Sequence, residues 1–154
     1  MLFLMFQLGR DRYVLDTGQV EAVLPLLAAK QLPGAPAGVT GAISYRGRPV
    51  PVVDLALLAL GRPAERRLST RIILLRYPSV PGSIDLLGLL VEHAVETIQR
   101  DPADFTTSGV EAGMPPYLGP VASDDRGLIQ WVRSEALLSP DIRDILFRQR
   151  EAEL

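Results

Sequence analysis

Few side chains in this sequence have the type and spacing that chemistry at a site requires. His93 is the only histidine, Lys30 is the only lysine and is followed by Gln31, and there is no cysteine. A Walker A loop needs Gly-Lys-Ser/Thr, and a zinc site needs three or four Cys, His or carboxylate ligands, so the sequence predicts neither. We therefore expect no enzyme activity, no metal and no cofactor.

The carboxylates and His93 add no support for catalysis. The carboxylates are scattered along the chain, as Asp16, Asp54, Asp85, Glu92 and Glu96. Nothing places two of them across a cleft, as acid–base catalysis would need. His93 lies between two predicted strands, 86–91 and 94–99, and on strict alternation it points the same way as Val91. A strand histidine, packed or at an edge, is therefore favoured over a ligand.

An arginine at the tip of a predicted hairpin is the best candidate for a binding group. Apolar runs at 42–45 and 50–53 flank Arg46-Gly47-Arg48, and Asp54 closes the second run. Asp54 is also a suitable N-cap for a helix over 55–60 that ends at Gly61. Arg46 pairs either with a local carboxylate, Asp54 or Asp16, or with carboxylates and helix-end carbonyls of a partner, and both roles are compatible.

The elements around this hairpin are mostly strands with a period of two. Strands are predicted at 2–8, 12–16, 71–77, 86–91, 94–99, 117–122 and 128–132. Ser139-Pro140-Asp141 predicts the start of a C-terminal helix with an apolar stripe of Ile142, Ile145 and Leu146. Many short strands separated by turns indicate an all-β barrel or sandwich.

Composition excludes several classes of protein. The chain has 154 residues, 47% of them hydrophobic, which suffices for one domain with a real core. A net charge of −2 gives no basic footprint for nucleic acid or for an anionic membrane surface. The opening run MLFLMF is far shorter than the about 20 residues of a membrane span, so it predicts a buried strand and no direct membrane insertion. We expect a soluble, cytoplasmic protein.

The order of the motifs resembles the CheW-like family, the small coupling proteins of bacterial chemosensory arrays. The family signature is approximately G-V-I-N-L-R-G-x-V-I-P-V-V-D-L, and the segment 41–55 reads GAISYRGRPVPVVDL. The opening F-x-x-F-x-L-G is matched from Phe3, and G-L-x-V-D is matched from Gly88 with Glu92 in the acidic position. The similarity extends over almost the whole chain.

The resemblance implies a fold and a function that composition alone does not give. It implies an all-β fold of two small five-stranded SH3-like barrels side by side, with short helices including one at the C-terminus, and a connector around 54–69 near their join. It implies a single domain over 1–154. The function implied is a non-enzymatic adaptor between chemoreceptor cytoplasmic tips and the regulatory domain of a CheA-type histidine kinase, with other CheW-like domains as partners in rings.

The receptor-binding residues that the resemblance implies lie in two segments. They are Val20, Glu21, Val23, Val39, Gly41, Ile43, Arg46 and Gly47. Val20 and Val23 are equally compatible with a place in the core. The family's glutamate is replaced here by Ala22, and Glu21 should point to the other side of the strand. The kinase-facing residues are not assigned, and a peptide- or ligand-binding β-barrel outside chemosensory signalling remains the alternative.

Overall fold

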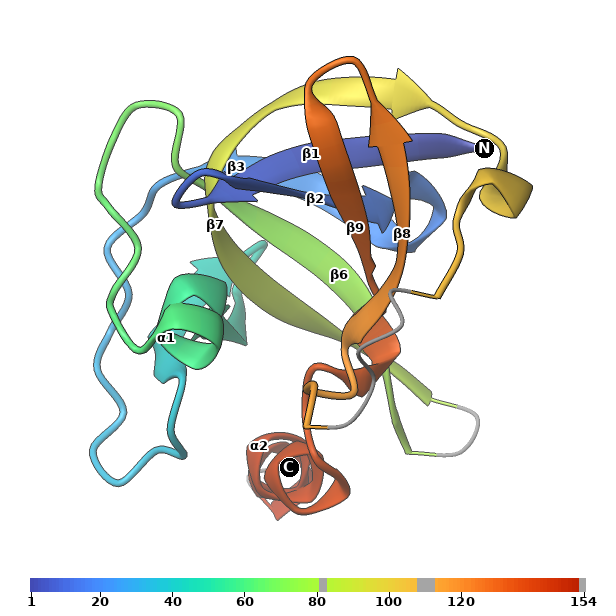
Figure 1. Cartoon of the computed structure of the whole chain (residues 1–154). Coiled ribbons are helices and arrows are strands. Elements are labelled where there is room, and N and C mark those ends of the chain that lie inside the picture. Colours follow the sequence, from blue (N-terminus) through green and yellow to red (C-terminus); the bar gives the residue numbers. More distant parts are fainter. Residues whose placement is uncertain (81–82, 108–112, 153–154) are drawn as a thin grey trace.

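One long strand, β7 (Ser83–Gln99), runs through both halves of the molecule and bends in its middle (Figure 1). The computed structural model describes residues 1–80, 83–107 and 113–152. The other strands are β1 (Leu2–Leu8), β2 (Asp11–Asp16), β3 (Val20–Pro25), β4 (Val39–Tyr45), β5 (Arg48–Asp54), β6 (Arg71–Val80), β8 (Leu118–Asp124) and β9 (Gly127–Val132). The two α-helices of the described residues are α1 (Leu55–Leu60) and α2 (Pro140–Ala152).

The strands form two five-stranded halves that both contain β7. The first half has the order β3-β6-β7-β5-β4, with β7 antiparallel to β6 and parallel to β5. The second half has the order β7-β1-β2-β9-β8, with β2 and β9 parallel. Neither sheet closes fully. The predicted all-β fold of two SH3-like barrels side by side is confirmed.

A bulge in β7 marks the passage from one barrel to the other. Met5 lies opposite Glu96 and Gln7 lies opposite Glu92, so one residue of β1 faces three residues of β7. Such an insertion bends a strand and resets its alternation. The prediction of two separate strands was therefore wrong, because the bulge leaves one continuous strand. The predicted shared orientation of Val91 and His93 was also wrong, since Val91 is buried and His93 is exposed.

The opening strand β1 is buried on both faces, which explains its unbroken apolar sequence. Phe3 and Met5 belong to a small core inside the second barrel, with Val14, Phe105, Ala122 and Ile129. Leu4, Phe6 and Leu8 face the main core, which continues into the first barrel. The prediction of a buried opening strand is confirmed.

Helix α1 begins and ends where the sequence predicts. The Asp54 carboxylate accepts a hydrogen bond from Leu57 N (3.2 Å), and Gly61 ends the helix with φ 72°. The second Asp54 oxygen accepts a hydrogen bond from Ala64 N (2.9 Å). The Asp54 side chain, which is 2% exposed, therefore pairs with one backbone N–H of the helix and one of the connector that follows it. Both oxygens of this carboxylate have local partners, and it does not pair with Arg46.

The C-terminal segment is attached to β6 through Tyr77. The Tyr77 hydroxyl donates to Glu135 O (3.0 Å) and accepts from Leu138 N (3.2 Å), and its ring stacks on Phe147. The predicted helix start at Pro140 is confirmed. The predicted apolar stripe is only partly right, because Ile145 is 49% exposed and Phe147 supplies the buried contact instead.

Candidate functional site

The candidate residues of β3 point to both of its faces. Val20 and Ala22 are half-buried against the main core, whereas Glu21 and Val23 are exposed, Val23 at 42%. This alternation places Glu21 on the opposite side of the strand from Ala22, as the sequence predicted. The Glu21 carboxylate pairs with Arg76 Nε of the neighbouring strand at 2.8 Å. The outer face of β3 therefore presents an apolar side chain beside an ion pair.

The candidate residues of β4 have mainly structural positions. Ile43 is 5% exposed and belongs to the main core, so its side chain offers no surface to a partner. Val39 is half-buried against the same core. Gly41 is buried at φ 153°, and a Cβ there would lie 2.1 Å from Lys30 O. Gly41 thus allows the chain after β3 to reach β4.

The close approach of Gly41 to Lys30 links β4 to the chain that follows β3. Strands β3 and β4 are the outer strands of their sheet, and the chain between them forms a single bridge. Lys30 N donates to Ala42 O (2.8 Å) and Ala42 N donates to Lys30 O (2.9 Å). The structure therefore places the two candidate segments on opposite edges of one sheet, joined through Lys30.

The hairpin tip presents Arg46 to solvent in an unusual backbone conformation. Arg46 has φ 51°, a left-handed value that non-glycine residues rarely adopt, and Gly47 follows at φ 77°. The Arg46 guanidinium lies 5.3 Å from the centre of the Tyr45 ring, which orients it without using its donors. In the described part of the chain it makes no ion pair with Asp54 or Asp16, so the predicted local pairing was wrong.

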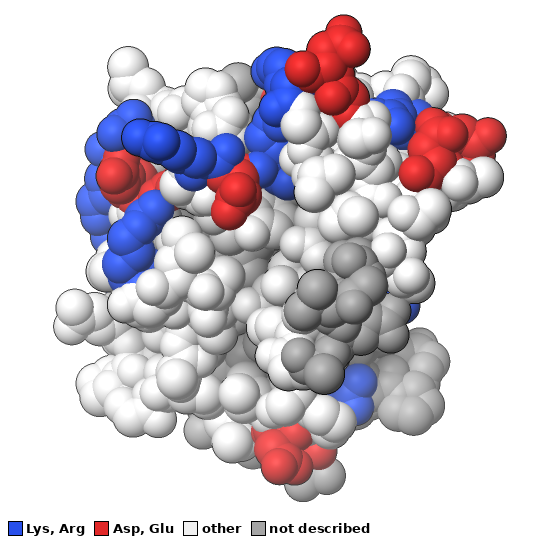
Figure 2. Space-filling view, viewed as in Figure 1, with Lys and Arg blue, Asp and Glu red and all other residues white. Residues whose placement is uncertain are grey.

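A buried carboxylate, Glu92, connects three segments at the join of the barrels. It accepts hydrogen bonds from Gly9 N of the β1–β2 turn (3.0 Å), from both terminal nitrogens of Arg62 (2.9 and 3.3 Å) and from Glu65 N (2.6 Å). The hydrogen bonds from Arg62, opposed by partial burial, lower the Glu92 pKa to about 2. We call this arrangement the Glu92 network. Basic and acidic side chains are intermixed at the upper left of Figure 2, where the connector after α1 runs in the same view of Figure 1.

A second ion pair fastens the β8–β9 hairpin to β2. Both terminal nitrogens of Arg12 contact the Asp124 carboxylate, at 2.7 and 2.6 Å, and Arg12 is 7% exposed. The hydrogen bonds from Arg12 hold the Asp124 pKa well below its usual range. The pair is bidentate, which is the strongest geometry for an arginine and a carboxylate. Its role is to hold the second barrel together.

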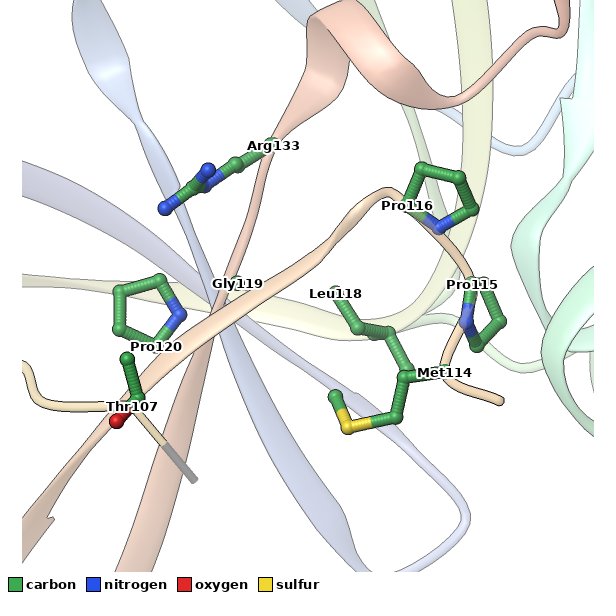
Figure 3. A pocket seen from close by; sticks show the side chains of 8 residues that line it. All are labelled: Thr107, Met114, Pro115, Pro116, Leu118, Gly119, Pro120 and Arg133. Atoms are coloured by element: carbon green, nitrogen blue, oxygen red, sulfur yellow. The ribbon is translucent and has the colours of Figure 1, made fainter. Parts of the chain in front are cut away.

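A shallow pocket of about 270 Å³ lies beside β8 (Figure 3). Its walls are the prolines at 115, 116 and 120 with Met114 and Leu118, and Arg133 lies at its edge. Few of the labelled side chains are polar, whereas a small-molecule site usually has several polar groups that point toward the ligand. The pocket is compatible with an apolar contact and indicates no chemistry.

Aromatic and metal-ligating side chains do not form a surface site in the described residues. Seven of the nine aromatic residues are buried, and half-buried Trp131 packs edge-on against Phe3 (4.9 Å) and Phe105 (5.2 Å). The aromatic ladder that a peptide-binding SH3 groove needs is thus missing from the described surface. Within the same residues, no three His, Cys, Asp or Glu side chains gather closely enough to hold a metal ion.

None of the helices in the described residues is both long enough and apolar enough to cross a bilayer.

Two open SH3-like barrels built on one shared strand define a double-barrel β domain. The chain belongs to the CheW-like domain family, whose model matches residues 2–141. This confirms the resemblance seen in the sequence. Among solved structures, the chain is similar to the scaffolding protein TtCheW from Thermoanaerobacter tengcongensis, with a TM-score of 0.75 and 22% identity over 90% of this chain and 87% of that one. Curated proteins give no significant match.

Sequence reasoning missed the Glu92 network and the contact between Tyr45 and Arg46. In the sequence, Glu92 was one of the scattered carboxylates and the acidic position of a motif, and the connector around 54–69 was given no role in a site. The signal available was the combination of an acidic residue ending an apolar strand with an arginine-rich segment elsewhere. The register that brings them together depends on the bulge in β7, which no local pattern marks.

Proposed function

We propose that this protein is a non-enzymatic adaptor of a bacterial chemosensory array. It binds the cytoplasmic tip of a chemoreceptor and the regulatory domain of a CheA-type histidine kinase, at the inner face of the membrane. Membership of the CheW-like family supports the scaffold role. The observation that carries the proposal is the hairpin tip, where Arg46 is exposed, lies over Tyr45 and has donors that no described residue uses.

The proposed receptor-binding surface combines this tip with the outer face of β3. Val23 supplies exposed apolar area, and Glu21 with Arg76 supplies charges beside it. An amphipathic receptor helix would bury its apolar face on Val23 and offer carboxylates or carbonyls to Arg46. Of the other candidate residues, Gly47 shapes the exposed hairpin tip, and the buried or half-buried Val20, Val39, Gly41 and Ile43 support the surface from below.

The kinase-binding surface is a separate part of the proposal. The resemblance implies that the kinase regulatory domain is itself a double barrel, and contacts between unlike faces of similar domains close into rings when the rotation allows. Other CheW-like domains would enter the same rings. Single interfaces of this kind are modest, and multivalency gives the assembly its strength.

Calorimetric titration against a receptor-tip fragment and a kinase regulatory domain from the same genome tests the proposal. The wild-type chain should bind both. Val23→Arg places a charge on the exposed β3 face without entering the core, and Arg46→Ala removes the tip donors. Each should weaken receptor binding about tenfold or more and leave kinase binding unchanged.

Leu128→Arg is the matched control, because Leu128 is 65% exposed at the tip of the other barrel. This variant should bind the receptor fragment like the wild type. Circular dichroism of each variant checks that the fold is intact. Absence of binding to both partners by the wild-type chain would refute the adaptor function. Equal weakening by all three variants would refute the assigned surface.

A further inference from the structure

A polar cavity of about 410 Å³ opens at the join of the two barrels, next to the Glu92 network. Three segments form it: the turn between β1 and β2, the connector from Arg62 to Thr70, and the bulge of β7. Its lining residues come from elements of both barrels, and none of the candidate receptor-binding residues is among them. The adaptor function proposed above makes no use of it.

Four side chains that line the cavity have donors with no partner within the described residues. They are Gln7, Arg10, Ser69 and His93. Arg10 and His93 are exposed, whereas Gln7 and Ser69 are half-buried. The backbone of Ser69 is used, since its carbonyl accepts from Ala94 N (3.1 Å), and its hydroxyl remains available. The cavity is therefore rich in unused donors from three different segments.

The two carboxylates that line the same cavity, Glu65 and Glu92, already have partners. The Glu92 carboxylate accepts four hydrogen bonds, two of them from Arg62. Glu65 is paired with Arg67 at 2.5 Å. The third lining arginine, Arg10, has no carboxylate partner, so the lining carries one positive charge in excess before His93 is counted. Unused donors with excess positive charge select an anion.

The backbone at His93 gives a second, independent indication. His93 has φ 50°, a strained value for a residue with a side chain, and it stands in the bulge. Strained backbone of this kind is concentrated at functional sites, where the surrounding structure maintains it. The bulge turns the imidazole out of the core and onto the cavity wall, opposite the β1–β2 turn that carries Arg10.

We propose that this cavity binds a compact phosphate-bearing small molecule, such as a phosphate monoester or a diphosphate. The Arg10 guanidinium offers two parallel donors to phosphate oxygens, and His93, Ser69 and Gln7 supply further hydrogen bonds. No Phe, Tyr or Trp is among the cavity's lining residues, and the proposal therefore concerns the phosphate groups and includes no nucleobase. A bound ligand would contact both barrels and stiffen their join.

Calorimetric titration of the full chain with sodium pyrophosphate, and separately with inorganic phosphate, tests this site at ionic strength held constant with sodium chloride. Saturable binding of pyrophosphate is expected. Arg10→Gln and His93→Asn should each weaken it about tenfold, the effect of losing one charge-assisted hydrogen bond. Asparagine tolerates the left-handed backbone at position 93, so this variant should keep its fold.

Arg66→Gln is the matched control, because Arg66 is an exposed arginine of the same connector that does not line the cavity. It removes the same charge and should change the affinity less than twofold. Equal weakening by Arg66→Gln would show general surface attraction and refute the site. Absence of saturable binding to the wild-type chain at millimolar pyrophosphate would also refute it. If His93→Asn alters the circular dichroism spectrum, Arg10→Gln decides alone.

Discussion

Replacing Glu92 with glutamine should destabilise the protein in a way that depends on pH. The side chain keeps its shape but loses the charge that Arg62 and two backbone N–H groups recognise. The Glu92 pKa is lowered from 4.5 to about 2 in the folded protein, mainly by the hydrogen bonds from Arg62. This difference corresponds to roughly 3 kcal/mol. Because one side of the network borders an open cavity, solvent screening reduces the expected value to about 2 kcal/mol.

The sign of the pH dependence follows from the direction of the shift. A lowered folded-state pKa stabilises the fold above the unfolded value of 4.5, and this contribution is lost as the pH falls through about 2. The difference in free energy of unfolding between the wild type and Glu92→Gln should therefore be about 2 kcal/mol at pH 7. It should fall below about 1 kcal/mol at pH 3, where much of the wild-type contribution is gone.

Urea-induced unfolding, followed by circular dichroism between pH 7 and pH 3, measures this difference. Glu96→Gln is the matched control, since Glu96 lies on the same strand and pairs with Arg126 at 3.3 Å in an exposed position. Its replacement should cost no more than about 0.5 kcal/mol at any pH. A Glu92→Gln effect that is the same at pH 3 and pH 7, or no larger than that of the control, would refute the reasoning.

Two further replacements test other contacts of the fold. Gly41→Ala should cost more than about 3 kcal/mol or prevent folding, because the added Cβ meets Lys30 O, whereas Gly47→Ala, with open space around it, should cost about 1 kcal/mol in urea unfolding. Arg12→Met should cost about 2–3 kcal/mol because the Asp124 carboxylate loses its bidentate arginine partner and keeps only the hydrogen bond from Arg126 N. Adding Asp124→Asn to Arg12→Met should recover part of that loss, and no recovery would contradict the pairing argument.

Local signals in the sequence sufficed for elements whose causes are themselves local. Asp54 and Gly61 determine both ends of α1, and the apolar run from Leu2 predicted a buried strand without a partner being known. The strands predicted at 2–8 and 12–16 likewise match β1 and β2 to within one residue. Each of these elements depends on capping, turn geometry or alternation within a few residues.

Contacts between distant segments could not be predicted in this way. The two-barrel arrangement came from family resemblance, because periodicity alone does not state which strands pair. A local carboxylate, Asp54 or Asp16, was one of the two kinds of partner expected for Arg46, but Asp54 is used by the helix end and the connector. Ile43 entered the candidate surface by its motif position, although the closure of the barrel buries it. These outcomes depend on register and burial in the folded chain.

The bulge in β7 accounts for the largest error and also for the most informative part of the structure. Strict alternation would place Glu92 and His93 on opposite faces and turn His93 inward with Val91. The additional residues instead bury Glu92 in its network and expose His93 on the wall of the adjoining cavity. A bulge has a cost in strand pairing and backbone strain that a regular strand would avoid. The position of the bulge where the two barrels meet is explained if the bulge both joins the barrels and forms the proposed anion site. The Glu92→Gln variant tests the first role through stability, and the His93→Asn variant tests the second through pyrophosphate binding.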